Sequence, residues 1–161
     1  MSEGERTEAD KAIRSNLLRD SRLLAARKVT AYLPMSDEPD LRPLMDELVE
    51  RDVKVFVPKI VGDDIEMIAY QRGTECAVNS LGIVEPIEGE QTIEADVYLV
   101  PMVAYHGLDR LGHGKGYYDR YLAGKSGYKI GVAYAVQREA FEAQAHDVPM
   151  DKVVTEEEIC E

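Results

Sequence analysis

Tryptophan is absent from this chain, and cysteine and histidine are scarce. Cys76 and Cys160 lie far apart and form no C-x-x-C pair, so they are interpreted as reduced thiols without a metal or redox role. His106 and His146 are interpreted as surface or loop residues, because three histidines without ligand spacing do not make a zinc site. These scarcities argue against a structural zinc site.

Positive charge is also in short supply. Nineteen basic residues face 31 acidic ones, which gives a formal net charge of −12. This charge repels nucleic acid and anionic membranes over most of the surface, so neither is an expected partner. The longest strongly apolar stretch, residues 97–105, is too short to span a bilayer, and the amino terminus lacks the apolar segment of a secretory signal. We therefore expect a cytoplasmic protein whose basic residues gather where an anion binds.

The length of 161 residues and the apolar content of 45% fit one domain, residues 1–161, with a real core. Apolar residues recur at helical spacing in two segments, residues 7–27 and residues 41–49, and Asp40 is the expected cap of the second. Shorter helices are expected at 117–122 and 139–145, and residues 71–96 are expected to be mostly loop with one short element. Strands are expected at 28–33, 53–57 (ended by Pro58), 65–70, 97–103 and 129–134. This alternation predicts an α/β fold with a mostly parallel central sheet flanked by helices.

A glycine-rich run, RLGHGKGYY from Arg110 to Tyr118, follows the most apolar predicted strand. Glycines at 112, 114 and 116 allow main-chain N–H groups to approach an anion, and Lys115 adds a full positive charge. The spacing matches neither the P-loop nor the dinucleotide-binding fingerprint, and a glycine-rich surface turn is the alternative. We interpret the run as a phosphate-binding loop beyond the carboxyl ends of the strands.

Further blocks accompany this loop in a fixed order. VPMVAY at 100–105 precedes the loop, which continues through Asp119 to Arg120. The other blocks are YLPMSDE at 32–38, PK at 58–59, GIVEP at 82–86, GVAY at 131–134, HDVPMD at 146–151 and VTE at 154–156. Over residues 29–157 they resemble the 5-formyltetrahydrofolate cyclo-ligase family, also called 5,10-methenyltetrahydrofolate synthetases. The resemblance implies a fold like that of the NagB, RpiA and CoA transferase proteins.

The resemblance also implies a function. Family members convert 5-formyltetrahydrofolate to 5,10-methenyltetrahydrofolate and release ADP and phosphate, with ATP and Mg²⁺ as cofactors. The implied ATP-binding residues are Lys11, Arg14, Arg110, Leu111, Gly112, His113, Gly114, Lys115, Gly116, Tyr117 and Tyr118. The implied substrate-binding residues are Leu33, Glu38, His113 and Tyr117. Lys115 and Tyr117 are the catalytic candidates, with Lys115 stabilising the transferred phosphoryl charge.

Asp119 and Asp147 fall on the family's magnesium positions, and two carboxylates with phosphate oxygens and water suit this hard ion. Without the resemblance, Asp119 would be a helix-terminal acid and Asp147 an acid in an Asx turn. Glu38 matches the acid that approaches the pterin, although alone it would be interpreted as a solvated loop acid.

The amino-terminal end departs from the family. Asp10 stands where the family has a lysine, and Lys11 comes one residue late. The helix at 7–27 is short relative to the family, with roughly twenty residues missing before the strand at Lys28, a deletion that loops tolerate. Two alternatives therefore stay open: a nucleotide- or folate-binding paralogue without turnover, and an ATP-dependent enzyme for another small carbonyl substrate. A monomer or weak homodimer is expected.

Overall fold

The computed structural model describes residues 1–161. The helices are α1 (Glu3–Leu17), α2 (Ser21–Ala25), α3 (Arg42–Glu50) and α4 (Tyr117–Leu122), with a 3₁₀ turn, η1 (Ala135–Gln137). The strands are β1 (Lys28–Thr30), β2 (Lys54–Val61), β3 (Asp64–Ala69), β4 (Cys76–Val78), β5 (Val84–Pro86), β6 (Gln91–Thr92), β7 (Val97–Pro101), β8 (Ala104–His106), β9 (Asp109–Leu111), β10 (Tyr128–Val132), β11 (Lys152–Val154) and β12 (Ile159–Cys160). No helix is both long and apolar enough to cross a membrane.

Eight strands form the main sheet in the order β12-β11-β10-β7-β1-β2-β3-β6, and β4–β5 and β8–β9 form two separate hairpins. The five inner strands, β11 to β2, pair in parallel, while β12, β3 and β6 pair antiparallel at the edges. The predicted α/β fold with a mostly parallel sheet is confirmed. Because parallel strands end at one edge, the segments after β1, β7 and β10 meet there.

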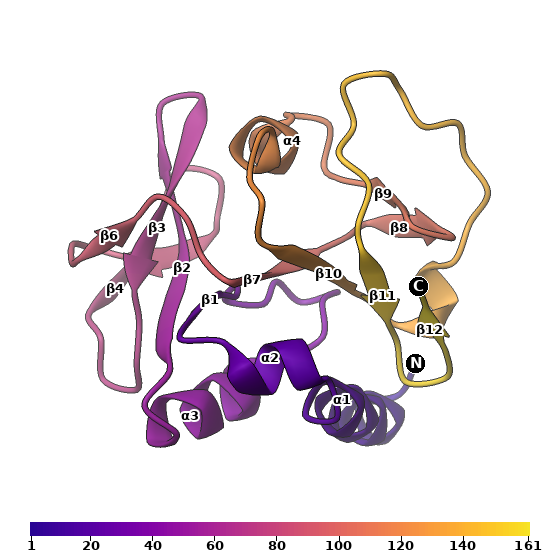
Figure 1. The fold of residues 1–161 in the computed structure, drawn as a ribbon, viewed down its shortest axis with the longest axis horizontal. Helices are drawn as coiled ribbons and strands as arrows, with labels where there is room; N and C mark the ends of the chain where they lie inside the picture. The colour runs from indigo at the N-terminus through magenta and orange to yellow at the C-terminus, as the bar shows by residue number, and fades with distance from the viewer.

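Helices cover both faces of the sheet, with α1, α2 and α3 below it and α4 above it in the view of Figure 1. Strand β7 shows how the sequence divides between the two faces. Val97 and Leu99 join a cluster of 21 buried residues that packs against α1 and α3, whereas Tyr98 and Val100 join a cluster of 8 that includes Leu122 of α4. Every residue of β7 is buried, which explains its nearly continuous apolar sequence.

The helix predicted at 7–27 is two helices. Helix α1 begins early, at a capping box formed by Ser2 and Glu5, and ends at Leu17. Asp20 then caps α2 by accepting hydrogen bonds from the N–H groups of residues 22 and 23 at 2.9 and 3.0 Å. The break depends on this cap, because no glycine or proline marks it in the sequence.

Helix α3 matches its prediction closely, although its cap differs. Leu41 holds the N-cap position, and Asp40, one residue earlier, accepts the N–H of Arg42 at 3.0 Å. Pro43 lies in the first turn, where its missing N–H costs nothing.

Pro58 does not end β2, contrary to the prediction. The carbonyl of Phe56 accepts from Ala31, and the N–H of Ile60 donates to Glu85, so alternate residues of β2 face away from β3. Pro58 lies between these two residues and faces the same way, where β1 has ended and no strand needs its N–H. Strand β2 therefore runs on to Val61 and forms a long hairpin with β3.

Two other segments differ from expectation. Residues 139–145 form no helix, because Glu139 donates to the carbonyl of Tyr105 at 3.0 Å and Phe141 packs near the ring of His106, which holds the chain along β8. Residues 71–96 contain three short strands rather than one short element. Short strands of this kind carry too few residues to show a period.

Candidate functional site

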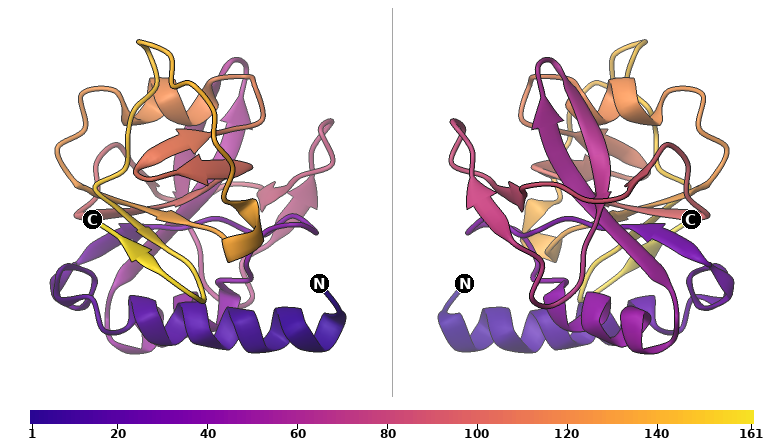
Figure 2. Two further views of the ribbon diagram at one scale, coloured as in Figure 1. Left: turned by 90° about the vertical axis from the view of Figure 1, so that its right-hand side faces the viewer. Right: turned by 90° about the vertical axis from the view of Figure 1, so that its left-hand side faces the viewer.

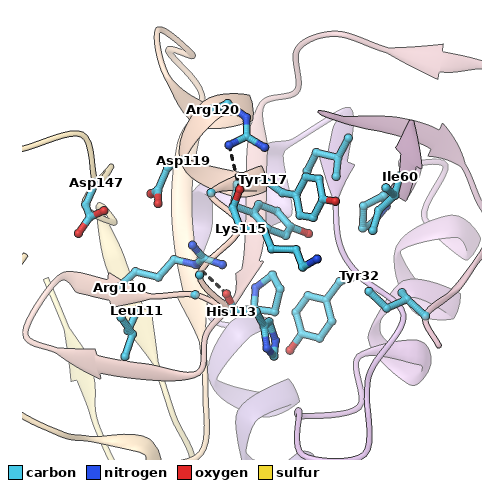
Figure 3. Close-up of a pocket in the computed structure, with 18 of the residues that line it drawn as sticks. Tyr32, Ile60, Arg110, Leu111, His113, Lys115, Tyr117, Asp119, Arg120 and Asp147 are labelled. Carbon is cyan, nitrogen blue, oxygen red and sulfur yellow. Dashed lines mark hydrogen bonds between the residues drawn. The ribbon is translucent and has the colours of Figure 1, made fainter. Parts of the chain in front are cut away.

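A cavity of about 780 Å³ opens at the carboxyl edge of the sheet. Its lining comes from the segment after β1, from β2, from the tip of the β4–β5 hairpin, from the glycine loop with α4, and from the loop after η1. Figure 3 shows the side chain of Lys115 pointing from the glycine loop into this space, with Tyr32 on the same side of the view and Asp119 and Asp147 on the other side. The topology therefore brings distant parts of the sequence to one site.

The glycine loop presents a row of free main-chain donors. No N–H group of residues 112–119 donates a hydrogen bond within the protein. Gly116 holds the N-cap of α4 in the left-handed region, with φ 71° and ψ 13°, and no side chain caps this helix. Unpaired N–H groups arranged in this way form a concave site for an anion.

Backbone conformation favours glycine at positions 114 and 116 of this loop, and flexible arginine side chains lie close to positions 112 and 116. A Cβ at position 112 would lie 3.0 Å from Nη1 of Arg110, and one at position 116 would lie 2.8 Å from Nη1 of Arg120. Gly114 has φ +92° and faces open space, so there the backbone conformation rather than crowding favours glycine. The free donors beside a cavity favour a binding loop over the alternative of a simple surface turn.

Arg110 is a buried cation beneath the loop. Its residue is 7% exposed, its Nε donates to the carbonyl of Pro101 at 2.8 Å, and its guanidinium lies 5.0 Å from the ring centre of Tyr118. Burial lowers the pKa of this guanidinium, and nearby tyrosine and acidic side chains oppose that shift. Since a guanidinium has five N–H donors, most of its bonding capacity remains unused by the protein.

Glu38 is a buried acid in the segment after β1. It is 6% exposed, and its Oε1 accepts the N–H of Met35 at 2.8 Å. Burial raises the pKa of its carboxyl to about 6, although the Met35 hydrogen bond and the charge of Arg110 lower it. The solvated loop acid expected without the resemblance is therefore not what the structure contains. Tyr32 stands beside it and donates to the carbonyl of Pro39 at 3.2 Å.

Lys115 and Arg120 differ in what they do for the loop. The side chain of Lys115 is exposed, points into the cavity and forms no ion pair or hydrogen bond with the protein. Arg120 donates from Nη1 to the carbonyl of Lys115 at 2.9 Å and from Nη2 to the carbonyl of Asp63. Arg120 thus ties the loop to the β2–β3 hairpin, while Lys115 stays available for a ligand.

Asp119 and Asp147 both line the cavity, and a main-chain contact links their segments. Asp119 accepts the N–H of Val148 at 3.1 Å, and Asp147 accepts the N–H of Gln144 at 2.8 Å. Asp119 has no protein partner for its other oxygen, and the other oxygen of Asp147 lies 3.6 Å from Nε2 of His146. No group of three or more metal-ligating side chains is present, so the protein alone does not enclose a metal ion.

Two predicted residues lie outside this cavity. Lys11 is exposed on α1 and pairs with Glu8 at 3.4 Å, and Arg14 also contributes nothing to the lining. The α1 residues that face the Glu38 segment are Arg6, whose Nη2 lies 3.5 Å from the carbonyl of Glu38, and Asp10. The assignment of Lys11 and Arg14 to ATP stays a prediction, without support from their positions. Leu33 and the loop residues Arg110 to Tyr118 all line the cavity.

The sequence reasoning missed the apolar wall of the site. Ile60, Ile65, Leu81 and Ile83 line the cavity beside Tyr32. Ile60 could have been found from the turn at Gly62, which separates two apolar runs in the manner of a hairpin. The contribution of Leu81 and Ile83 had no such signal, because their hairpin packs against β2 through contacts distant in sequence.

Taken together, the fold and the site define a class of protein: an α/β protein with a cavity suited to an anionic ligand beyond the carboxyl edge of its sheet. The comparisons with known proteins are more specific. A model of the 5-formyltetrahydrofolate cyclo-ligase family matches residues 1–156. The chain belongs to this family, which confirms the resemblance noted in the sequence.

Individual relatives agree with the family match. A 5-formyltetrahydrofolate cyclo-ligase from Mycolicibacterium smegmatis is 33% identical over 146 residues, which cover 82% of this chain and 75% of the relative. The enzyme of the same name from Mycoplasma genitalium is 38% identical over 132 residues, covering 80% and 72%. The NMR structure of 5,10-methenyltetrahydrofolate synthetase from Aquifex aeolicus has a TM-score of 0.85 and 37% identity, covering 99% of this chain and 84% of that chain. A synthetase structure from Mycoplasma pneumoniae has a TM-score of 0.78 and 26% identity, covering 97% and 90%.

Proposed function

We propose that the protein catalyses the ATP-dependent conversion of 5-formyltetrahydrofolate to 5,10-methenyltetrahydrofolate, with release of ADP and phosphate. One observation carries the proposal beyond family membership: a row of unpaired N–H donors and the free amine of Lys115 share one cavity with the buried acid Glu38. The first two suit a polyphosphate, and the third suits a heterocycle with paired N–H donors.

The nucleotide phosphates fit the loop of residues 112–119. Their oxygens would take the free N–H donors, and Lys115 would neutralise charge on the phosphoryl group that is transferred. Arg110 lies beneath the loop with most of its donors unused, so it adds fixed positive potential at the same place. In an acidic protein this concentration of cations is what directs the anion to the cavity.

A magnesium ion also fits the site. Asp119 and Asp147 each keep a carboxylate oxygen without a hydrogen bond to the protein, and hard oxygen donors of this kind suit Mg²⁺ when phosphate oxygens and water complete its coordination. A bound ion would screen negative charge on the phosphates. The absence of a larger acidic cluster matches an ion held jointly by the protein and the nucleotide.

The pterin part of the folate fits beside Glu38. A carboxylate can accept the two N–H donors of an aminopyrimidinone edge in parallel. Leu33, Tyr32 and the apolar wall of Ile60, Ile65, Leu81 and Ile83 would supply nonpolar surface for the folate. This placement brings the formyl group toward Lys115 and Tyr117. The formyl oxygen is a weak nucleophile, so the protein contributes mainly by positioning it and by stabilising the phosphoryl charge.

A turnover assay tests the proposal directly. The protein is mixed with Mg-ATP and 5-formyltetrahydrofolate, and the methenyl product is followed by its near-ultraviolet absorbance while phosphate release is measured in parallel. Equal amounts of both products are expected. A folded protein that makes neither product, but binds ATP or folate in calorimetry, is a binding paralogue. Phosphate release only with other carbonyl compounds identifies the different ATP-dependent enzyme.

We also propose that the protein works in the cytoplasm, as a monomer or weak homodimer. Both cysteines are free and partly exposed, which suits a compartment that keeps thiols reduced. Size-exclusion chromatography with light scattering would measure the oligomeric state.

A further inference from the structure

Glu85 joins two separate pieces of chain at the apolar wall of the cavity. Its Oε2 accepts a hydrogen bond from the main-chain N–H of Ile60 at 2.8 Å and another from Nδ2 of Asn79 at 3.0 Å. Ile60 belongs to β2, whereas Asn79 lies in the β4–β5 hairpin. Glu85 itself does not line the cavity.

Asn79 extends this connection to the tip of the hairpin. Its Oδ1 accepts the N–H groups of Leu81 and Ile83 at 2.9 and 3.1 Å, and its own N–H donates to the carbonyl of Ile83 at 2.9 Å. Leu81, Ile83 and Ile60 all line the cavity. The Glu85 carboxylate therefore fixes wall side chains in both segments, Ile60 in β2 and Leu81 and Ile83 in the hairpin.

Apart from Glu85, the hairpin is held mainly at its base. In both views of Figure 2 it stands out from the main sheet, and its strands form a separate two-stranded sheet. Val78 is 67% exposed and Val84 is 44% exposed, so these two valines contribute little buried apolar surface to its docking, whereas Pro86 at the base of β5 is buried. The other hydrogen bond from β2 to this region runs from Nζ of Lys59 to the carbonyl of Ile87, at the base of the hairpin.

The location of Glu85 also explains why an acid is useful there. On this edge of β2, the strand β1 has ended and Pro58 has no N–H, so the N–H of Ile60 would lack a partner. A carboxylate accepts two donors at once, and charged acceptors make the stronger hydrogen bonds. Glu85 thus completes β2 and docks the hairpin with the same oxygen.

We propose that Glu85 is a positioning residue that holds the β4–β5 hairpin against β2 and so sets the shape of the apolar wall that contacts the folate. This inference rests on the proposed function for the identity of the ligand. It predicts an effect on folate binding but not on the nucleotide, because the loop of residues 112–119 makes no hydrogen bond to the hairpin.

Three variants test the proposal. Glu85→Ala removes both hydrogen bonds, and we expect its KM for 5-formyltetrahydrofolate to rise roughly tenfold, as for the loss of a hydrogen bond to a charged group. Its KM for ATP and its kcat should stay within about twofold, since the loop is untouched. Glu85→Gln keeps an acceptor oxygen, so it should recover most of the folate affinity. Glu88→Ala removes the same charge from an exposed neighbour with no side-chain hydrogen bond and should match the wild type.

Hydrogen exchange supplies a readout that needs no turnover. The amides of residues 79–83 should exchange faster in Glu85→Ala than in Glu88→Ala or the wild type, with no change in α4. Unchanged exchange, or a folate KM equal to that of the wild type, overturns the positioning role. A parallel fall in kcat and in the affinity for both substrates also overturns it, because that pattern marks general unfolding. A wild type that exchanges as expected but makes no methenyl product contradicts the proposed function instead.

Discussion

Buried charge occurs at two places in this molecule, and the protein treats it differently at each. Lys152 and Asp20, which are 8% and 6% exposed, form an ion pair with Nζ and Oδ2 only 2.6 Å apart, and the second oxygen of Asp20 caps α2. At the carboxyl edge of the sheet, Arg110 and Glu38 are 7% and 6% exposed, yet each side chain makes only one hydrogen bond to the protein, in both cases to the main chain.

The difference separates a structural pair from a binding site. A buried ion is costly unless its hydrogen bonds are completed, and Asp20 completes its own within the fold. Arg110 and Glu38 do not, so their remaining donors and acceptors are available to a ligand that enters the cavity. Unused bonding capacity at buried charges, rather than charge itself, is what marks the functional end of this sheet.

The largest expected effect is on stability, when one partner of the buried Asp20–Lys152 pair is removed. Asp20→Ala leaves Lys152 buried beside only the exposed Glu161 and removes the cap of α2, so we expect the free energy of unfolding to fall by roughly 3–5 kcal/mol. Activity per folded molecule should be unchanged. Urea denaturation with a turnover assay measures both.

The double variant Asp20→Leu with Lys152→Met sharpens this result, since it removes both charges and should lose less stability than Asp20→Ala alone. The pH dependence gives a second check. Burial alone would raise the pKa of Asp20, but hydrogen bonds from Lys152 and the main chain lower it below 3.8. The stabilisation is therefore present at neutral pH and lost as the pH falls through the lowered pKa. A double variant that loses as much stability as Asp20→Ala would contradict the account.

Lys115→Ala tests the opposite case, a charge without protein partners. We expect kcat to fall about 100-fold or more, because the phosphoryl charge loses its mobile cation. The melting temperature should not change, since the Lys115 side chain makes no hydrogen bond or ion pair and its carbonyl still accepts from Arg120. Lys54→Ala is the matched control, since it removes an exposed lysine at the start of β2, the end of this strand that does not line the cavity. Normal turnover in Lys115→Ala would mean that the loop is wrongly assigned.

Glu38→Gln should improve stability while it weakens folate binding. The pKa of Glu38 is raised to about 6 in the fold, so the ionised carboxylate costs stability above that pH, and below pH 4.5 the cost disappears. The variant should therefore be more stable than the wild type by about 2 kcal/mol at pH 8 and by little at pH 4. Thermal denaturation at both pH values measures this difference. A variant that is destabilised at pH 8 would mean that the protein already compensates the charge of Glu38, as it does for Asp20.

The smallest effect is on the pH dependence of folate binding. Only the ionised form of Glu38 can accept two N–H donors, so the KM for 5-formyltetrahydrofolate should rise roughly tenfold between pH 7 and pH 5. Glu38→Gln should have a higher KM at pH 7 but should lose this pH dependence. Steady-state kinetics across the range decides, and an equally steep profile in the variant would point to another titrating group.

Local sequence signals predicted the parts of the fold that local physics determines. The continuous apolar run of β7 and the glycine loop before α4 were both recognisable, because burial on two faces and free N–H groups each demand particular residue types. The loop residues placed at the site by resemblance do line the cavity, as do Glu38, Asp119 and Asp147.

The features that the sequence did not predict depend on distant partners. Pro58 continues β2 only because β1 ends beside it, and residues 139–145 stay extended only because they lie along β8. Arg110 was placed in a loop, but it belongs to the β8–β9 hairpin, which buries its side chain against Pro101. Lys11 pairs with Glu8 on the surface of α1, and its assignment to ATP stays a prediction.

A crystal structure of the complex with ADP, magnesium and 5-formyltetrahydrofolate tests the central claim most directly. We expect phosphate oxygens on the N–H groups of residues 112–119 and the pterin edge on the carboxylate of Glu38. Ligand atoms should then supply the hydrogen bonds that Glu38 and Arg110 lack in the free protein. A nucleotide bound elsewhere, or a pterin that leaves Glu38 and Arg110 as they are in the free protein, would contradict it.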